Sequence, residues 1–236
     1  MKLCQSRRFL SAAPLRPAMP RRSDPNWAIV APDVAGYVDG LANRGGAELA
    51  AVEEQGEREG WPIVGAAEGS LLHILAKSIG ARRILELGTA IGYSGTWLAR
   101  ALVEGGQLLT VEADPETAKI AGANFAKTGV ASRVTILVGS AQAVLKDLES
   151  PFDLIFNDIS KDGYPAVLEP CIRRLRVGGL LVTDNVLWHG EVARKGRSKE
   201  TDAIREYNER LSKDPRMIAS ILPLRDGVSV ALKIRD

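Results

Sequence analysis

Cysteine and histidine are scarce in this sequence, and each scarcity excludes a class of site. The two cysteines, Cys4 and Cys171, make no disulfide framework, so we expect both to be free thiols. With only two histidines besides, there is no cluster of the kind that binds zinc. Long hydrophobic runs are also missing, since no stretch approaches the roughly 18 residues that a membrane-spanning helix needs.

The small net charge of +2 conceals an uneven distribution. Residues 1–22 contain six basic side chains and no acidic one, and the rest of the chain carries 25 basic and 29 acidic side chains. This mildly acidic body lacks the basic footprint of a nucleic-acid-binding protein. The Arg-rich leader, residues 1–24, is similar to an organelle transit peptide. We favour a disordered tail, or an overlong start with Met19 as the first residue, and therefore a cytoplasmic protein.

Apolar runs and helical patterns alternate from residue 82 onward. Strands are predicted at 82–87, 107–112, 133–138, 152–158 and 179–184, and helices at 94–103, 115–128, 141–148, 163–175 and 199–213. Two final runs, 217–222 and 228–234, are split by Asp226-Gly227, which is typical of an antiparallel hairpin. The pattern predicts an α/β fold with a doubly wound, Rossmann-like sheet, mostly parallel with a C-terminal antiparallel hairpin.

The length favours a single domain over residues 25–236. Ahead of the first strand, residues 25–62 have a weakly apolar helical pattern, and residues 68–79 have a stronger one. We expect the former to supply two helices outside the sheet, available to cover a site or a partner subunit.

The first strand ends in a glycine turn that favours a nucleoside cofactor. Its glycines, Gly88 and Gly92, read G-x-x-x-G and not the G-x-G-x-x-G of dinucleotide folds. Glu86 would repel a pyrophosphate but attract an ammonium or sulfonium group. Glu112, at the end of the second strand, is placed to bind a ribose diol. Together they indicate S-adenosylmethionine, against the alternative of a chance turn beside two surface acids.

Polar side chains end the fourth and fifth strands. Asp158 ends one run, Asp184 and Asn185 end the next, and Lys161 follows three residues after Asp158. Because one crossover separates these strands, the three oxygen-bearing side chains are expected to converge. They suit a hard divalent cation, Mg²⁺ first and Mn²⁺ or Ca²⁺ as alternatives. Loop-forming Asx residues and a solvated lysine would give the same pattern.

Three stretches resemble the cation-dependent O-methyltransferases, the family of caffeoyl-CoA and catechol O-methyltransferases and their small bacterial relatives. They are Glu86-Leu-Gly-Thr-Ala-Ile-Gly-Tyr-Ser94, Phe156-Asn-Asp-Ile-Ser-Lys161 and Val182-Thr-Asp-Asn-Val-Leu-Trp188, and the resemblance spans roughly residues 63–235. It implies a transferase that uses S-adenosylmethionine and a divalent cation, and commonly a homodimer. One departure is Ser160, where relatives often carry a second acid.

The resemblance also implies roles for individual residues. The cofactor would be bound by Glu86, Gly88 and Ser94 at its methionine part, by Glu112 at its ribose, by Ser140 and Ala141 at its adenine, and by Asp158 at its amine. The metal ligands would be Asp158, Asp184 and Asn185, the general base Lys161, and the acceptor-pocket aromatic Trp188. Tyr164 is expected to be structural, and His189 lies at the pocket rim or on the surface.

The expected reaction is methyl transfer to a vicinal diol, on a catechol-type phenolic small molecule or a hydroxycinnamoyl thioester. The base role requires a neutral Lys161, and we expect the nearby cation to lower the pKa of its ammonium. The alternatives are a tRNA hydroxyuridine methyltransferase and a non-catalytic S-adenosylmethionine-binding module. The basic segment 191–199 would meet an anionic substrate or form a solvated loop, and we favour the loop.

Overall fold

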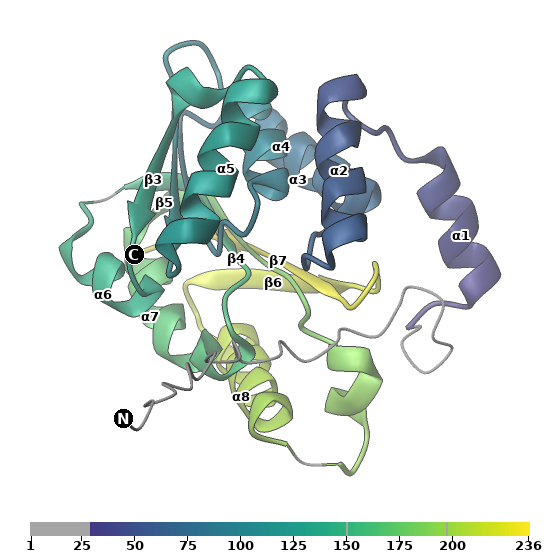
Figure 1. Ribbon diagram of the computed structural model, residues 1–236. Helices are drawn as coiled ribbons and strands as arrows, with labels where there is room; N and C mark the ends of the chain where they lie inside the picture. The colour runs from purple at the N-terminus through teal and green to yellow at the C-terminus, as the bar shows by residue number, and fades with distance from the viewer. Residues whose placement is uncertain (1–28, 150, 197) are drawn as a thin grey trace, which may run out of the picture.

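The computed structural model describes residues 29–149, 151–196 and 198–236, which form one seven-stranded sheet with helices on both faces (Figure 1). The order is β3-β2-β1-β4-β5-β7-β6. The strands are β1 (Arg83–Leu87), β2 (Gln107–Glu112), β3 (Val134–Val138), β4 (Phe152–Asn157), β5 (Leu175–Thr183), β6 (Met217–Leu222) and β7 (Val228–Lys233). Strands β1 to β5 pair in parallel, and β7 pairs antiparallel with β5 and β6. The predicted doubly wound sheet with its C-terminal hairpin is confirmed.

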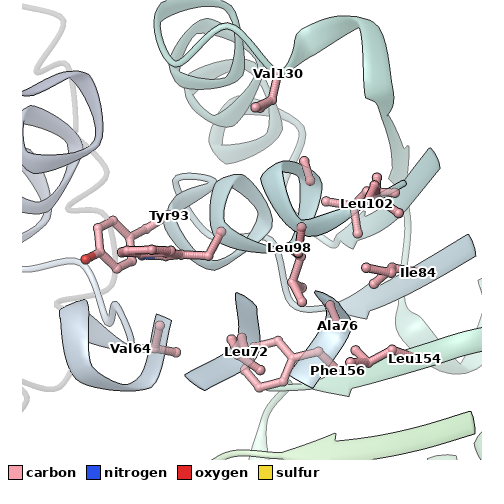
Figure 2. Close-up of a cluster of buried hydrophobic side chains, with 14 of the residues drawn as sticks. Val64, Leu72, Ala76, Ile84, Tyr93, Leu98, Leu102, Val130, Leu154 and Phe156 are labelled. Atoms are coloured by element: carbon pink, nitrogen blue, oxygen red, sulfur yellow. The ribbon is translucent and has the colours of Figure 1, made fainter. Parts of the chain in front are cut away.

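Alternate residues of the buried strands point into two separate hydrophobic clusters, as a sheet covered on both faces requires. One cluster packs the strands against α3 (Gly65–Ser78), α4 (Tyr93–Ala101) and α5 (Pro115–Lys127). Figure 2 shows this cluster, with Leu72 and Leu98 from the helices meeting Ile84, Leu154 and Phe156 from the strands. The other packs them against α6 (Ala141–Asp147), α7 (Tyr164–Arg174) and α8 (Lys199–Lys213).

The fifth strand begins earlier than its sequence pattern predicts. It starts at Leu175, not at residue 179, because Gly178 and Gly179 do not interrupt it. Leu175 pairs with Phe152, and the register then shifts before Leu154 pairs with Leu180. A bulge absorbs extra residues in this way without ending a strand. The predicted helix at 163–175 likewise differs, since a 3-10 turn at Lys161–Gly163 precedes α7.

Two helices precede the α3 layer, α1 (Pro32–Leu41) and α2 (Ala47–Glu59), within the range predicted for them. Helix α2 buries Leu49 and Val52, whereas α1 has no buried residue and lies at the outer side of α2 (Figure 1). Cys171 is a buried free thiol, and Cys4 lies outside the described residues together with the rest of the basic leader. Among the helices described, none is long and apolar enough to cross a membrane.

Candidate active site

The glycine turn after β1 lies directly beside the end of β4. Leu87 pairs in register with Asn157, and the Asp158 N–H donates to the Leu87 carbonyl at 2.8 Å. Gly88 has a φ of +101°, and a β-carbon there would lie 2.4 Å from the Asp158 carbonyl oxygen. Only glycine fits this close approach. The turn predicted to hold the cofactor and the acid predicted to hold the metal are therefore neighbours.

Glu86 lies completely buried beneath the turn. One carboxylate oxygen accepts from the Ser94 hydroxyl and the other from the Thr110 hydroxyl, each at 2.6 Å. Burial raises the pKa of Glu86 to about 7, although these two hydrogen bonds act in the opposite direction. The two predicted cofactor residues Glu86 and Ser94 thus bond to each other, and Thr110 is a partner that the sequence did not reveal.

Glu112 ties the end of β2 to the glycine turn. Its carboxylate accepts the Ala90 N–H at 2.9 Å and the Asp114 N–H at 3.0 Å. Ala90 has a φ of +45°, so this carboxylate fixes a turn residue in the left-handed region. The remaining predicted cofactor contacts lie at the next strand end, where Ser140 caps α6 through the Ala143 N–H at 3.2 Å. Ala141 is buried in the first turn of α6.

The ends of β4 and β5 lie side by side, as the sequence predicts. Asn157 pairs with Thr183, so Asp158 and Asp184 follow at adjacent positions. The Lys161 ammonium donates to Asp158 Oδ1 at 2.8 Å and lies 5.5 Å from the centre of the Tyr164 ring. The Tyr164 hydroxyl donates to the Asp184 carbonyl at 2.8 Å. Tyr164 therefore links the predicted base to the predicted metal ligand.

The carboxylates at this edge perturb one another. Burial, reinforced by the Asp158 charge, raises the pKa of Asp184 to about 7. Burial also opposes the charge on Lys161, but Asp158 and Asp184 outweigh it, and the pKa of the ammonium is raised. This raised pKa belongs to the protein alone, whereas the predicted lowering was attributed to a nearby cation. Its cause is the short ion pair with Asp158, and a base role for Lys161 requires that this negative charge be balanced.

Three further charged residues lie at this edge and were not predicted from the sequence as part of the site. Glu68, in the first turn of α3, is completely buried, and neither of its oxygens accepts a hydrogen bond from another described residue. Arg225 Nε lies 3.8 Å from Glu68 Oε2, and Asp226 is also buried. Burial, followed by the Asp184 charge, raises the pKa of Glu68 well above its usual range. An acid among small residues, in Gly65-Ala-Ala-Glu-Gly69, is the signal that was available.

Trp188 and His189 follow the predicted ligand Asn185, within a 3-10 segment (Trp188–Ala193). Both side chains are partly buried, and their rings lie 5.0 Å apart at 37°. Downstream, Lys199 pairs with Asp162 at 2.7 Å. The Arg205 guanidinium holds the segment through the Val192 carbonyl at 3.1 Å and the Glu191 carbonyl at 2.8 Å. The basic segment is thus partly engaged within the protein itself.

Within the described residues, no three His, Cys, Asp or Glu side chains form a cluster able to hold a metal ion. The predicted ligand set instead combines two acids with the Asn185 amide. Acidic side chains nevertheless outnumber lysine and arginine side chains at this edge of the sheet. Besides burial, the charges of Asp158 and Asp184 both raise the pKa of Glu68, and the charge of Asp158 raises that of Asp184. Lys161 and Arg225 act in the opposite direction on the pKa of Glu68 and Asp184, and His189 and Lys161 do so on the pKa of Asp226.

A mostly parallel sheet of this order, with a Glu-x-Gly turn beside strand-end acids, defines a class I methyltransferase that uses S-adenosylmethionine. The chain belongs to the O-methyltransferase family, whose model matches residues 48–234.

Individual relatives agree over most of the chain. The catechol O-methyltransferase of Niastella koreensis is 35% identical over 212 residues, covering 85% of this chain and 93% of that protein. The catechol O-methyltransferase of Mycobacterium tuberculosis is 34% identical, covering 85% and 95%. The Streptomyces achromogenes O-methyltransferase TomG, solved with S-adenosylmethionine and involved in tomaymycin synthesis, superimposes with a TM-score of 0.79 at 31% identity, covering 92% of this chain and 100% of that one. A Bacillus cereus O-methyltransferase in complex with S-adenosylhomocysteine gives 0.78 at 32% identity, covering 88% and 98%.

Proposed function

We propose that this O-methyltransferase depends on a divalent cation and methylates one hydroxyl of a vicinal diol on a small phenolic acceptor. The observation that carries the proposal is the surplus of carboxylates at the ends of β4 and β5, next to the glycine turn. Relatives at about 35% identity that are named catechol O-methyltransferases support the acceptor class.

The residues present fit a hard divalent cation. Buried acids that repel one another are stabilised by a positive charge. Burial and, after it, the charge of Asp158 raise the pKa of Asp184, so a cation held between these carboxylates would stabilise their ionised forms. Asp158, Asp184 and Asn185 would hold the ion through oxygen atoms, which Mg²⁺ and Mn²⁺ prefer. When bound, such an ion supplies a Lewis acid that lowers the pKa of an acceptor hydroxyl.

Lys161 is the residue that we propose takes the proton from the acceptor. Its Nζ lies 2.8 Å from Asp158 Oδ1 and 3.3 Å from the Ile159 carbonyl, so its position is set by two acceptors. Balancing the charges of Asp158 and Asp184 removes the influence that raises the lysine's pKa, which the base role requires. The adjacent glycine turn would hold the methyl donor in line with the acceptor oxygen.

A methyl-transfer screen with labelled S-adenosylmethionine tests this proposal. The acceptors are catechol, its singly methylated analogue guaiacol, a hydroxycinnamoyl thioester and tRNA, each with and without a chelator. We expect transfer to the diols but not to guaiacol, loss of transfer with the chelator, and recovery with Mg²⁺. Transfer that resists the chelator would contradict the metal role, and transfer to tRNA alone would contradict the acceptor class. Cofactor binding without transfer to any acceptor would favour a binding module.

A further inference from the structure

The backbone after Asn185 adopts a costly conformation at the proposed acceptor side. Trp188 has a φ of 43° and His189 a φ of 54°, followed by Gly190 at 74°. Residues with a side chain rarely occupy this left-handed region, and such strain persists only where the surroundings impose it. The residue that imposes this backbone strain therefore influences how the acceptor is held.

One buried residue, Asp226, contacts this segment at two points. Its carboxylate accepts a hydrogen bond from the His189 N–H, and its carbonyl accepts the Leu187 N–H at 3.0 Å. The next carbonyl, of Gly227, accepts the Val186 N–H at 3.0 Å. Asp226 is only 1% exposed, so its hydrogen bonds are shielded from competing water. It therefore holds the strained turn from both sides of Trp188.

The loop that carries Asp226, between β6 and β7, is itself anchored. The Arg225 guanidinium donates to the Ile63 carbonyl at 3.1 Å and lies 3.8 Å from the buried Glu68. Gly227 has a φ of +88°, and a β-carbon there would lie 2.4 Å from Leu187 Cγ. The support for the turn is thus packed tightly against α3 and against the turn itself.

The side chains that this support positions follow closely after the proposed metal ligand Asn185. The Trp188 and His189 ring centres lie 5.0 Å apart with their planes tilted by 37°, Trp188 packs against the cluster on the α7–α8 face, and His189 Nδ1 lies 3.8 Å from Asp226 Oδ1. Trp188 is the residue that sequence resemblance places in the acceptor pocket. An aromatic pair held in one orientation offers a fixed surface on which a phenolic ring can pack.

We propose that Asp226 is the positioning residue of the acceptor site, holding Trp188 and His189 as a fixed wall against which the acceptor ring lies. The inference rests on the proposed function, since it assumes an aromatic acceptor. Asp226 acts through the His189 N–H and is not itself in contact with the acceptor. Its loss should therefore weaken acceptor binding and leave the cofactor side intact.

The test compares Asp226→Ala, which removes the acceptor of the His189 N–H, with Asp226→Asn, which retains an oxygen there. We expect Asp226→Ala to raise the KM for catechol at least about tenfold, with an unchanged Kd for S-adenosylmethionine by calorimetry. Asp226→Asn should recover most of the loss. In amide NMR spectra, the His189 proton should be shifted upfield in Asp226→Ala relative to the wild type and to Asp226→Asn, because only the alanine variant lacks an acceptor for it.

Asp153→Ala is the matched control. The Asp153 carboxylate also accepts backbone N–H groups, from Arg82 and Arg83 at 2.8 Å, but at the opposite ends of the strands. The Asp153→Ala variant should have a lower melting temperature but an unchanged KM for catechol. If Asp226→Ala does not fold, the change is made in a His189→Gly background, where glycine relieves the positive φ, and the KM should again rise over that of His189→Gly.

An unchanged KM in Asp226→Ala would overturn the proposal, and so would equal losses of acceptor and cofactor binding. Should the wild type methylate no diol, the proposed function fails. The His189 amide shift would then still test whether Asp226 holds the turn.

Discussion

The cofactor side and the acceptor side of this site differ in how their charges are satisfied. On the cofactor side, the oxygens of Glu86 and Glu112 all accept hydrogen bonds, from hydroxyls and from turn N–H groups. On the acceptor side, Glu68 accepts none from the described residues, and Asp184 is repelled by Asp158. The carboxylates of the cofactor side are therefore satisfied within the protein, whereas those of the acceptor side lack a balancing positive charge.

The two sides also differ in how they are built. The cofactor side consists of β1, β2 and the turn between Leu87 and Tyr93, which are close in sequence. The acceptor side gathers α3, the ends of β4 and β5 and the β6–β7 loop. It includes left-handed backbone at both Trp188 and His189, whereas the cofactor turn has one such non-glycine residue, Ala90. Strain and unbalanced charge at one place indicate that selection for binding outweighed selection for stability there.

The largest expected effect comes from removing the carboxylate that touches both sides. Asp158→Ala should reduce kcat by about 10²–10⁴-fold, because Lys161 loses the partner that positions it and the proposed cation loses a ligand. Labelled methyl transfer to catechol, with Mg²⁺ present, measures this. If Asp158→Ala turned over at the wild-type rate, with or without chelator, Asp158 would have no role on either side of the site.

A second prediction uses the titration of Glu86. Its pKa is about 7 in the folded protein against 4.5 ordinarily, so the native state retains a proton that the unfolded chain releases between these values. Glu86 should therefore contribute a fall of roughly 3 kcal/mol in the free energy of unfolding as the pH rises from about 4.5 to about 7. Glu86→Gln should lack this fall. Urea denaturation of both proteins at pH 5 and pH 8 isolates the difference, and parallel pH dependences would contradict it.

Gly88→Ala should be destabilising by more than backbone strain alone. The strain of a positive φ costs about 1–3 kcal/mol, and the β-carbon would in addition displace the Asp158 carbonyl. Gly129→Ala is the control, since Gly129 has a φ of +74° with nothing within 4 Å of a β-carbon. Thermal denaturation should show the larger loss for Gly88→Ala, accompanied by weaker S-adenosylmethionine binding. Equal losses of stability in the two variants would mean that the glycine turn is not in close contact with the end of β4.

The smallest effect is expected from Tyr164→Phe. It removes the hydrogen bond to the Asp184 carbonyl but keeps the ring beneath Lys161, and should cost about 1 kcal/mol of stability. Tyr207→Phe removes a comparable buried hydroxyl, which pairs with Thr183 at 2.6 Å. Mn²⁺ affinity should fall only in Tyr164→Phe. A similar fall in Tyr207→Phe would assign both tyrosines to general stability.

Most of the fold was predictable because its signals are local. Apolar runs and the Asp226-Gly227 turn placed the elements within a few residues. The error at the fifth strand has a local cause as well, since Gly178-Gly179 reads as a turn but forms a bulge whose partner lies on another strand.

The site was predictable where its residues lie at the ends of consecutive parallel strands. The convergence of Asp158 and Asp184 follows from the single crossover between β4 and β5, whereas the pairing of β1 with β4, which brings the glycine turn beside Asp158, came from the structure. The sequence did not predict the roles of Glu68, Arg225 and Thr110. Their partners lie on other helices, strands or loops, so no spacing along the chain indicates them. The raised pKa of Lys161 depends on the balance between burial and two carboxylates, which only coordinates reveal.

Titration of the protein with Mn²⁺, followed by electron paramagnetic resonance in the presence of S-adenosylmethionine, tests the central claim most directly. The claim is that the ends of β4 and β5 hold a divalent cation beside the methyl donor. We expect saturable Mn²⁺ binding to the wild type and its loss in Asp184→Asn, with the Kd for S-adenosylmethionine unchanged. Absence of Mn²⁺ binding by the wild type, or equal affinity in Asp184→Asn, would contradict it.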